Sequence, residues 1–262
     1  YQKKSFDIAL SEAAVLPSSP ESILSRNLSR DFWFTCAQQV GQKLNNQYPY
    51  NRQRLIDYFP QIRWNCTNVE FGLINVIKAL FKLGVTVIYQ PPFSSLHLSG
   101  ATFNVNKKPF IVLTDYKGFY STLWHCLLHE LYHVLFDWEE IKVNLYHASE
   151  NESECLTIDE KEVEANSFAR EYLFPAAKST EIYDFLRDKD YVNQYAKNNN
   201  LHPSIIYAYY AFDNSSVDRM AWARARSNNA DIKKSIYRLE NNWSDPMPID
   251  EYVKKIKLEI YN

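Results

Sequence analysis

Apolar residues recur three or four positions apart over most of the chain, which is the spacing of one face of an α-helix. The pattern therefore predicts a mainly helical protein. Proline, glycine and the ends of the apolar periods set the approximate limits of each element. The longer helices are expected over 20–45, 52–59, 68–83, 123–138 and 158–174. The shorter helices are expected over 191–196, 204–212, 217–226, 232–239 and 251–261.

The middle of the chain departs from this period. Apolar runs that are β-branched or alternating, over 85–89, 96–105 and 109–114, predict three strands, which we interpret as an antiparallel sheet. Gly84 fits the C-terminal cap of the helix before the first strand. Gly100 interrupts the second strand, which indicates a bulge or a close backbone approach. The polar stretch over 146–159 predicts a loop.

One motif in the helix over 123–138 carries chemistry. Residues 129–133 read His-Glu-Leu-Tyr-His, an H-E-x-x-H pattern. Positions four apart lie on one face of a helix, so His129 and His133 can reach the same metal ion, and Glu130 can address a water beside it. Leucines of this helix form a separate apolar stripe that faces the core. The pattern is typical of zinc hydrolases.

A catalytic zinc ion takes a third protein ligand and keeps one position open. The helix over 158–174 offers three glutamates, Glu160, Glu162 and Glu164, and is a better source than His147. Glu162 shares a face with Asn166, which can hold a ligand histidine by a hydrogen bond and fix its tautomer. Spacing alone leaves the choice among the glutamates open.

The composition excludes several classes of function. Lysine and arginine number 29 against 31 aspartate and glutamate residues, a net charge of −2, which does not favour a nucleic-acid surface. With 5 glycines, the chain has no glycine-rich loop for a phosphate or dinucleotide. Neither a secretory signal nor an uncharged apolar run of membrane-spanning length is visible. The 4 cysteines form no C-x-x-C pair, and we expect free thiols in a cytoplasmic protein.

The segment 162–169, Glu-Val-Glu-Ala-Asn-Ser-Phe-Ala, followed by Leu173 and Pro175, resembles the E-x-E-A-N-x-F-A…L-x-P signature of the ImmA/IrrE metallopeptidases. The stretch before His129 and the segment 195–206 are also similar to that family, so the resemblance covers about 50–212. It implies one zinc ion held by His129, His133 and Glu162, with Glu130 as catalytic base. Two departures are Tyr132, where the family usually has glycine, and His125, one turn before His129. We expect a structural or supporting role for His125.

The resemblance implies an α+β, zincin-like fold in which the small sheet packs on the H-E-x-x-H helix. We expect an N-terminal helical segment (1–50), a metallopeptidase domain (51–178) and a C-terminal helical region (179–262). The implied activity is zinc-dependent cleavage of a regulatory protein, such as a helix-turn-helix repressor or an antitoxin-like partner, in stress or phage defence.

The alternative is a non-catalytic regulatory module, of the antitoxin type, with a vestigial or structural metal site. Some relatives carry a DNA-binding domain upstream, and this chain begins at Tyr1. The region itself is not expected to bind nucleic acid, because Lys197 is the one Lys or Arg over 191–212. Nothing in the sequence indicates an oligomeric state.

Overall fold

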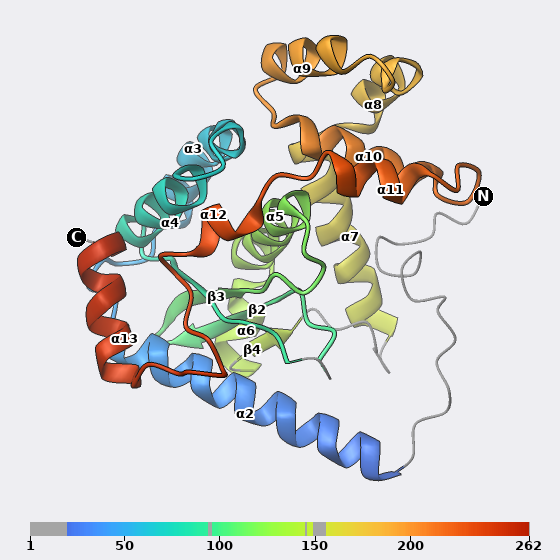
Figure 1. Ribbon diagram of the computed structural model, residues 1–262. Helices are drawn as coiled ribbons and strands as arrows, with labels where there is room; N and C mark the ends of the chain where they lie inside the picture. The colour runs from blue at the N-terminus through green and yellow to red at the C-terminus, as the bar shows by residue number, and fades with distance from the viewer. Residues whose placement is uncertain (1–19, 94–95, 145, 149–155, 262) are drawn as a thin grey trace.

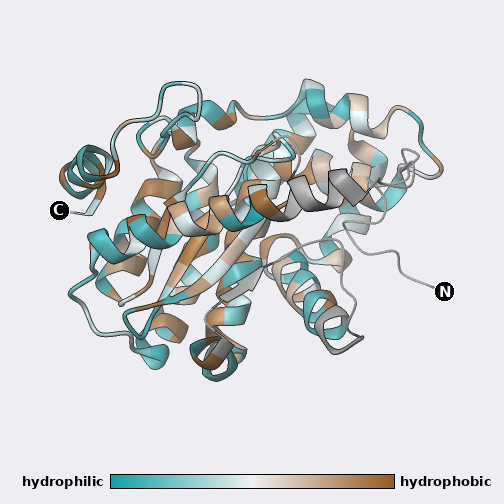
Figure 2. Ribbon diagram, turned by 90° about the horizontal axis from the view of Figure 1, so that it is seen from below, coloured by the Kyte–Doolittle hydropathy of each residue, from teal (hydrophilic) through white to brown (hydrophobic). Residues whose placement is uncertain are grey.

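A small mixed sheet lies at the centre of the molecule, with long helices packed against it (Figure 1). The computed structural model describes residues 20–93, 96–144, 146–148 and 156–261. Most of the described residues are helical, so the predicted mainly helical α+β class is confirmed. Apolar ribbon segments gather in the strands and inner helix faces, and hydrophilic segments lie over the outer helices (Figure 2).

Within the described residues the twelve helices include a counterpart of every predicted helix, and those over 138–144 and 176–182 were not predicted. The first seven are α2 (Pro20–Leu44), α3 (Arg52–Ile62), α4 (Gly72–Lys82), α5 (Tyr120–Phe136), α6 (Trp138–Asn144), α7 (Leu156–Leu173) and α8 (Ala176–Ile182). The remaining five are α9 (Lys189–Asn198), α10 (Pro203–Asn214), α11 (Ala221–Ser227), α12 (Ile232–Ile236) and α13 (Ile249–Ile256). Three short turns complete them: the 3₁₀ helices η1 (Arg63–Thr67) and η2 (Tyr183–Phe185), and the π-helical η3 (Lys257–Tyr261).

Helix ends agree with the sequence at two positions and differ at one. Asn45 directly follows α2, and Gly84 follows the C-cap residue Leu83 of α4; they adopt positive φ angles of 43° and 83°, as residues in the left-handed region at helix ends do. The predicted stop at Pro60 is wrong, because α3 continues through Pro60 to Ile62. Proline removes one backbone donor there, and the chain then tightens into η1.

The sheet has the strand order β1-β3-β2-β4 within the described residues, from β1 (Thr86–Tyr89), β2 (Gly100–Val105), β3 (Lys108–Leu113) and β4 (Tyr146–Ala148). The three predicted strands are present. The all-antiparallel arrangement is wrong, because β1 pairs with β3 in parallel, whereas β2 pairs with β3 and β4 antiparallel. The connection over 90–99 is long enough for β3 to insert between β1 and β2, and a tight hairpin joins β2 to β3.

The predicted loop over 146–159 contains two regular elements. Its first residues form the edge strand β4, and α7 begins at Leu156, while 149–155 lie outside the described residues. Three residues are too few to give a periodic signal in the sequence. The edge strand exists because β2 offers an unpaired side to it.

The two faces of β2 contact different helices. The Phe103 ring meets Phe34 of α2, with ring centroids 5.5 Å apart. On the opposite face, Thr102 donates a hydrogen bond to Glu130 of α5. The sheet therefore lies between α2 and α5, and it packs on the H-E-x-x-H helix as predicted (Figure 1). Side chains alternate between faces along a strand, so Gly100 lies on the α5 side.

Within the described residues, no helix combines the length and apolar character that a bilayer crossing requires. The three described cysteines, Cys36, Cys66 and Cys126, form no disulfide bond with one another. Cys155 lies outside the described residues.

Candidate metal centre

Helix α5 carries the two motif histidines at the centre of the molecule. His133 and Glu130 are fully buried, and His129 exposes 4% of its surface. The helix is buried on nearly every side, against the sheet and against α7. A buried imidazole is retained at such a position only where hydrogen bonds or a metal compensate for its lost hydration.

Glu162 of α7 is the third member of the cluster. Its carboxylate oxygens lie 3.2 Å from His129 Nε2 and 3.3 Å from His133 Nε2. The two Nε2 atoms are themselves 3.2 Å apart. In a tetrahedral zinc site with bonds of about 2.1 Å, ligand atoms lie about 3.4 Å from one another. The three side chains therefore have the spacing that one small metal ion needs, and they can hold it.

The other ring nitrogens of both histidines are committed to hydrogen bonds. His129 Nδ1 lies 3.0 Å from Asn166 Oδ1, and His133 Nδ1 lies 2.8 Å from Asp137 Oδ2. Both acceptors require a proton on Nδ1, so each Nε2 is left to present its lone pair to the metal position. Asn166 therefore lies where the sequence predicted a supporting residue. Asp137 follows His133 by four residues, a spacing visible in the sequence.

The charge of the cluster also favours a cation. Burial lowers the pKa of His133, but hydrogen bonds to Asp137 and Glu162 and the nearby Glu130 carboxylate outweigh it and raise the pKa to about 9. Three carboxylates thus surround an imidazole that binds a proton unusually strongly. The same electrostatic field would stabilise a divalent ion in place of that proton.

Glu130 is held on the sheet side of α5. Thr102 Oγ1 donates a hydrogen bond of 2.7 Å to Glu130 Oε2. A Cβ atom added at Gly100 would lie 2.8 Å from Glu130 Oε1 and 2.6 Å from Cys126 Sγ. The close approach predicted at Gly100 is thus confirmed, and its cause is the packing of β2 on the motif helix. Thr102 was missed by sequence reasoning, since no local pattern links a strand residue to a helix residue 28 positions later.

A buried chain of hydrogen bonds continues from Asn166. Asn166 Oδ1 also lies 3.1 Å from His125 Nε2, and His125 Nδ1 lies 2.9 Å from the Tyr209 hydroxyl of α10. Burial raises the pKa of Tyr209, so the hydroxyl remains protonated and donates to His125. His125 therefore supports Asn166 and lies outside the cluster of candidate ligands, in agreement with the expected role.

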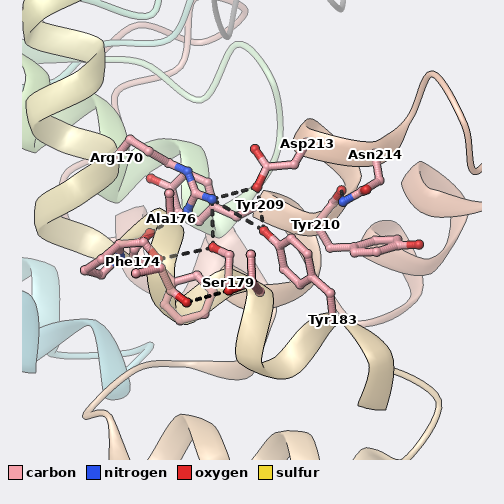
Figure 3. A network of polar contacts seen from close by, with 12 residues as sticks. Arg170, Phe174, Ala176, Ser179, Tyr183, Tyr209, Tyr210, Asp213 and Asn214 are labelled. Carbon is pink, nitrogen blue, oxygen red and sulfur yellow. Dashed lines mark hydrogen bonds and ion pairs between the residues drawn. The ribbon is translucent and has the colours of Figure 1, made fainter. Parts of the chain in front are cut away.

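Arg170 of α7 contacts α10, the helix that carries Tyr209 (Figure 3). Its guanidinium lies 4.0 Å from the centre of the Tyr209 ring and forms an ion pair of 2.7 Å with Asp213. It also donates to Phe174 O at the end of α7 and to Ser179 Oγ of α8. Helix α7, which brings Glu162 and Asn166, is thus fixed against α8 and α10 from the C-terminal region.

The remaining sequence candidates lie apart from the cluster. Glu160 is exposed, and Glu164 accepts a hydrogen bond of 2.6 Å from Tyr132, so neither is grouped with the histidines. Tyr132 packs between α5 and α7, with its ring centre 5.5 Å from that of Phe168. The hydroxyls of two buried tyrosines, Tyr89 and Tyr120, also donate away from the cluster, to Asp115 and to Cys66 O.

Comparison with models of protein families, with curated proteins and with solved structures gave no significant match. The interpretation of the cluster therefore depends on its own geometry and on the motifs of the chain.

Proposed function

We propose that the chain is a zinc-dependent endopeptidase. The observation that carries the proposal is the convergence of His129, His133 and Glu162 at 3.2–3.3 Å, with the Glu130 carboxylate on the same helix. Three protein ligands suit a catalytic zinc site, since a structural site uses four. The E-x-E-A-N signature around Glu162 supports the peptidase reading through its resemblance to the ImmA/IrrE family.

When bound, zinc supplies Lewis-acid polarisation of a carbonyl group and acidifies water. Glu130 acts as the general base, which accepts a proton from the attacking water and delivers it to the departing amine. Thr102 holds one oxygen of that carboxylate and so limits its rotation. Asn166 and Asp137 hold the two imidazoles in the tautomers that a metal requires.

The substrate that we propose is a regulatory protein with a DNA-binding or antitoxin-like character. This part of the proposal comes from the family resemblance alone. In this reading the region contacts the regulator and not the nucleic acid, in agreement with its net charge of −2.

A second candidate is a regulatory binding module whose metal has a structural role. One observation favours it: Glu130 is 0% exposed and its carboxylate already accepts a hydrogen bond from Thr102. A carboxylate so enclosed can serve to neutralise the charge of the cluster without taking part in hydrolysis.

Metal content and a matched pair of variants separate these possibilities. The zinc-loaded protein would be incubated with candidate repressors, and cleavage followed by mass spectrometry. Glu130→Gln is expected to retain zinc and lose at least about 100-fold in cleavage rate, the range of a general base. Glu162→Gln is expected to lose zinc, whereas Glu160→Gln, an exposed residue of the same helix, should behave as wild type.

Cleavage by Glu130→Gln at the wild-type rate would exclude the catalytic role of that residue. Zinc retention without any cleavage by the wild type would favour the second candidate. If the wild-type protein binds no zinc when it is incubated with an excess of the ion, both candidate functions are overturned.

A further inference from the structure

A pocket of about 950 Å³ opens beside the C-terminal end of α5. Its walls come from the segment before α3, the β2–β3 hairpin, the end of α5 and the helix α6. None of its lining residues belongs to the candidate metal cluster. The pocket is therefore a separate site, which neither the motif nor the proposed chemistry uses.

Positive charge dominates the lining. Four cations, Arg52, Lys107, Lys108 and Lys142, face one acidic residue, Glu139, among the described residues that line the pocket. Lys142 neutralises Glu139 in an ion pair of 2.6 Å. Three cations then remain, in a chain whose net charge is −2. Such a local excess attracts an anion into a concave surface.

Two of these cations have donors to offer a ligand. Arg52 uses Nε to bond Leu135 O at 2.8 Å, and its two terminal nitrogens have no hydrogen-bond partner within the described part of the chain. Lys107 is exposed at the hairpin turn, and its ammonium group forms no hydrogen bond or ion pair with the described residues. Lys108, in contrast, donates to Asn46 O. Arg52 and Lys107 are therefore the groups that can bind an anion.

The same pocket has aromatic walls. Among the lining residues Phe136 is 55% exposed and Tyr50 is partly exposed, and the ring centres of Tyr50 and Trp138 lie 5.9 Å apart. Aromatic rings with cations beside them, such as Phe136 with the Arg52 guanidinium 5.8 Å from its ring centre, fit a ligand that joins a flat ring to an anionic group. A volume of about 950 Å³ lies at the upper end of small-molecule sites, which span roughly 300–1,000 Å³.

We propose that this pocket binds a small anion that carries a planar ring, the chemistry of a nucleotide, and that its occupancy strengthens metal binding at the cluster. The binding site stands on the pocket alone. The second part rests on the proposed metal site.

The two sites are joined by the last turn of α5. Tyr50 donates to Val134 O at 3.1 Å and Arg52 to Leu135 O, so both hold carbonyls that directly follow His133. The next residues of that turn include Asp137, which bonds His133 at 2.8 Å. A ligand that orders Arg52 stabilises this turn and with it the Asp137–His133 contact. By linkage, metal at the cluster must then raise the affinity for the ligand by the same factor.

Calorimetric titration of the full chain with AMP tests the site, with inorganic phosphate and adenosine as partial ligands. AMP is expected to bind at least about tenfold more tightly than either fragment, because each supplies one half of the recognition. Equal affinity for AMP and adenosine would show that the pocket does not recognise the anionic group. Equal affinity for AMP and phosphate would show that it does not recognise the ring. Either result would overturn the proposal. If an acidic peptide competes with AMP and binds much more tightly than AMP does, the pocket belongs to a protein partner and the proposal is overturned.

Three variants locate the binding. Lys107→Asn suits the turn, since Lys107 has a φ of 61° and asparagine tolerates this region well. It should weaken AMP binding by about fivefold, the effect of one exposed charge pair. Arg52→Gln should weaken it by about tenfold or more, because arginine binds phosphate through two donors. Lys197→Gln changes an exposed lysine of α9, a helix that contributes no lining residue to the pocket, and should leave AMP affinity unchanged.

Unchanged affinity in Lys107→Asn and Arg52→Gln, or an equal loss in Lys197→Gln, would overturn the assignment. Melting temperatures of all three variants identify any that fails to fold, and Lys107→Asn alone suffices for the test. Repeating the titration with and without zinc measures the coupling. AMP affinity that does not change with zinc would overturn the regulatory part, whereas failure to bind zinc at all would contradict the proposed metal site.

Discussion

Removing the Asn166 amide should weaken metal binding although none of the three candidate metal ligands is changed. Its Oδ1 atom accepts from two buried rings, His129 Nδ1 at 3.0 Å and His125 Nε2 at 3.1 Å. In Asn166→Ala, His129 loses the acceptor that fixes its tautomer, and such outer partners are worth about 10–100-fold in metal affinity. That range corresponds to about 1.4–2.7 kcal/mol. Asn166 is partly exposed, so water can replace part of the lost hydrogen bonding, and we expect the lower half of the range.

Competition against a zinc-binding indicator measures this loss. Asn166→Asp keeps an oxygen acceptor for both rings and adds a negative charge, so its zinc affinity should equal or exceed that of the wild type. Ser167→Ala, an exposed neighbour on the same helix, is the matched control. Wild-type affinity in Asn166→Ala, or a loss in Asn166→Asp as large as in Asn166→Ala, would refute the role of the acceptor.

Three further predictions concern packing and protonation. Gly100→Ala should lower the melting temperature and any Glu130-dependent cleavage, because the added Cβ lies 2.8 Å from Glu130 Oε1. The pKa of His133, raised to about 9, means that zinc displaces a proton below that pH; apparent zinc affinity should therefore rise by about tenfold per pH unit from about 7 to 9, then level off. Arg170→Ala should cost about 3 kcal/mol of unfolding free energy in urea titration, and Asp213→Asn less, because Arg170 keeps its other acceptors.

The candidate metal cluster was largely predictable from the sequence because its parts are local. His129 and His133 are placed by helical spacing alone, and Asn166 by its position one turn after Glu162. The choice of Glu162 over Glu160 and Glu164 depended on the family resemblance. The structure reaches the same choice independently, since Glu162 alone of the three is grouped with the histidines.

The pairing of β1 with β3 and the edge strand β4 could not be read in the same way. Strand pairing depends on which segment fills the space beside a strand, and apolar alternation does not encode a neighbour. Thr102 and Tyr209 illustrate the same limit among side chains. Each contacts a residue of α5, across 28 and 84 positions respectively, and neither belongs to a recognisable motif.

Such long-range contacts connect the C-terminal helices to the residues that support the candidate ligands. Tyr209 of α10 forms a hydrogen bond with His125, which in turn contacts Asn166. Arg170 holds α7, the helix that carries Asn166, against α8 and α10. A metal site built on two helices needs those helices held at a fixed separation, because a shift of one ångström removes a ligand from bonding reach. Residues beyond α7 therefore set the spacing of the candidate ligands, although none of them contributes to the set. A domain boundary near 178, as the sequence suggests, would separate the cluster from part of what holds it in place.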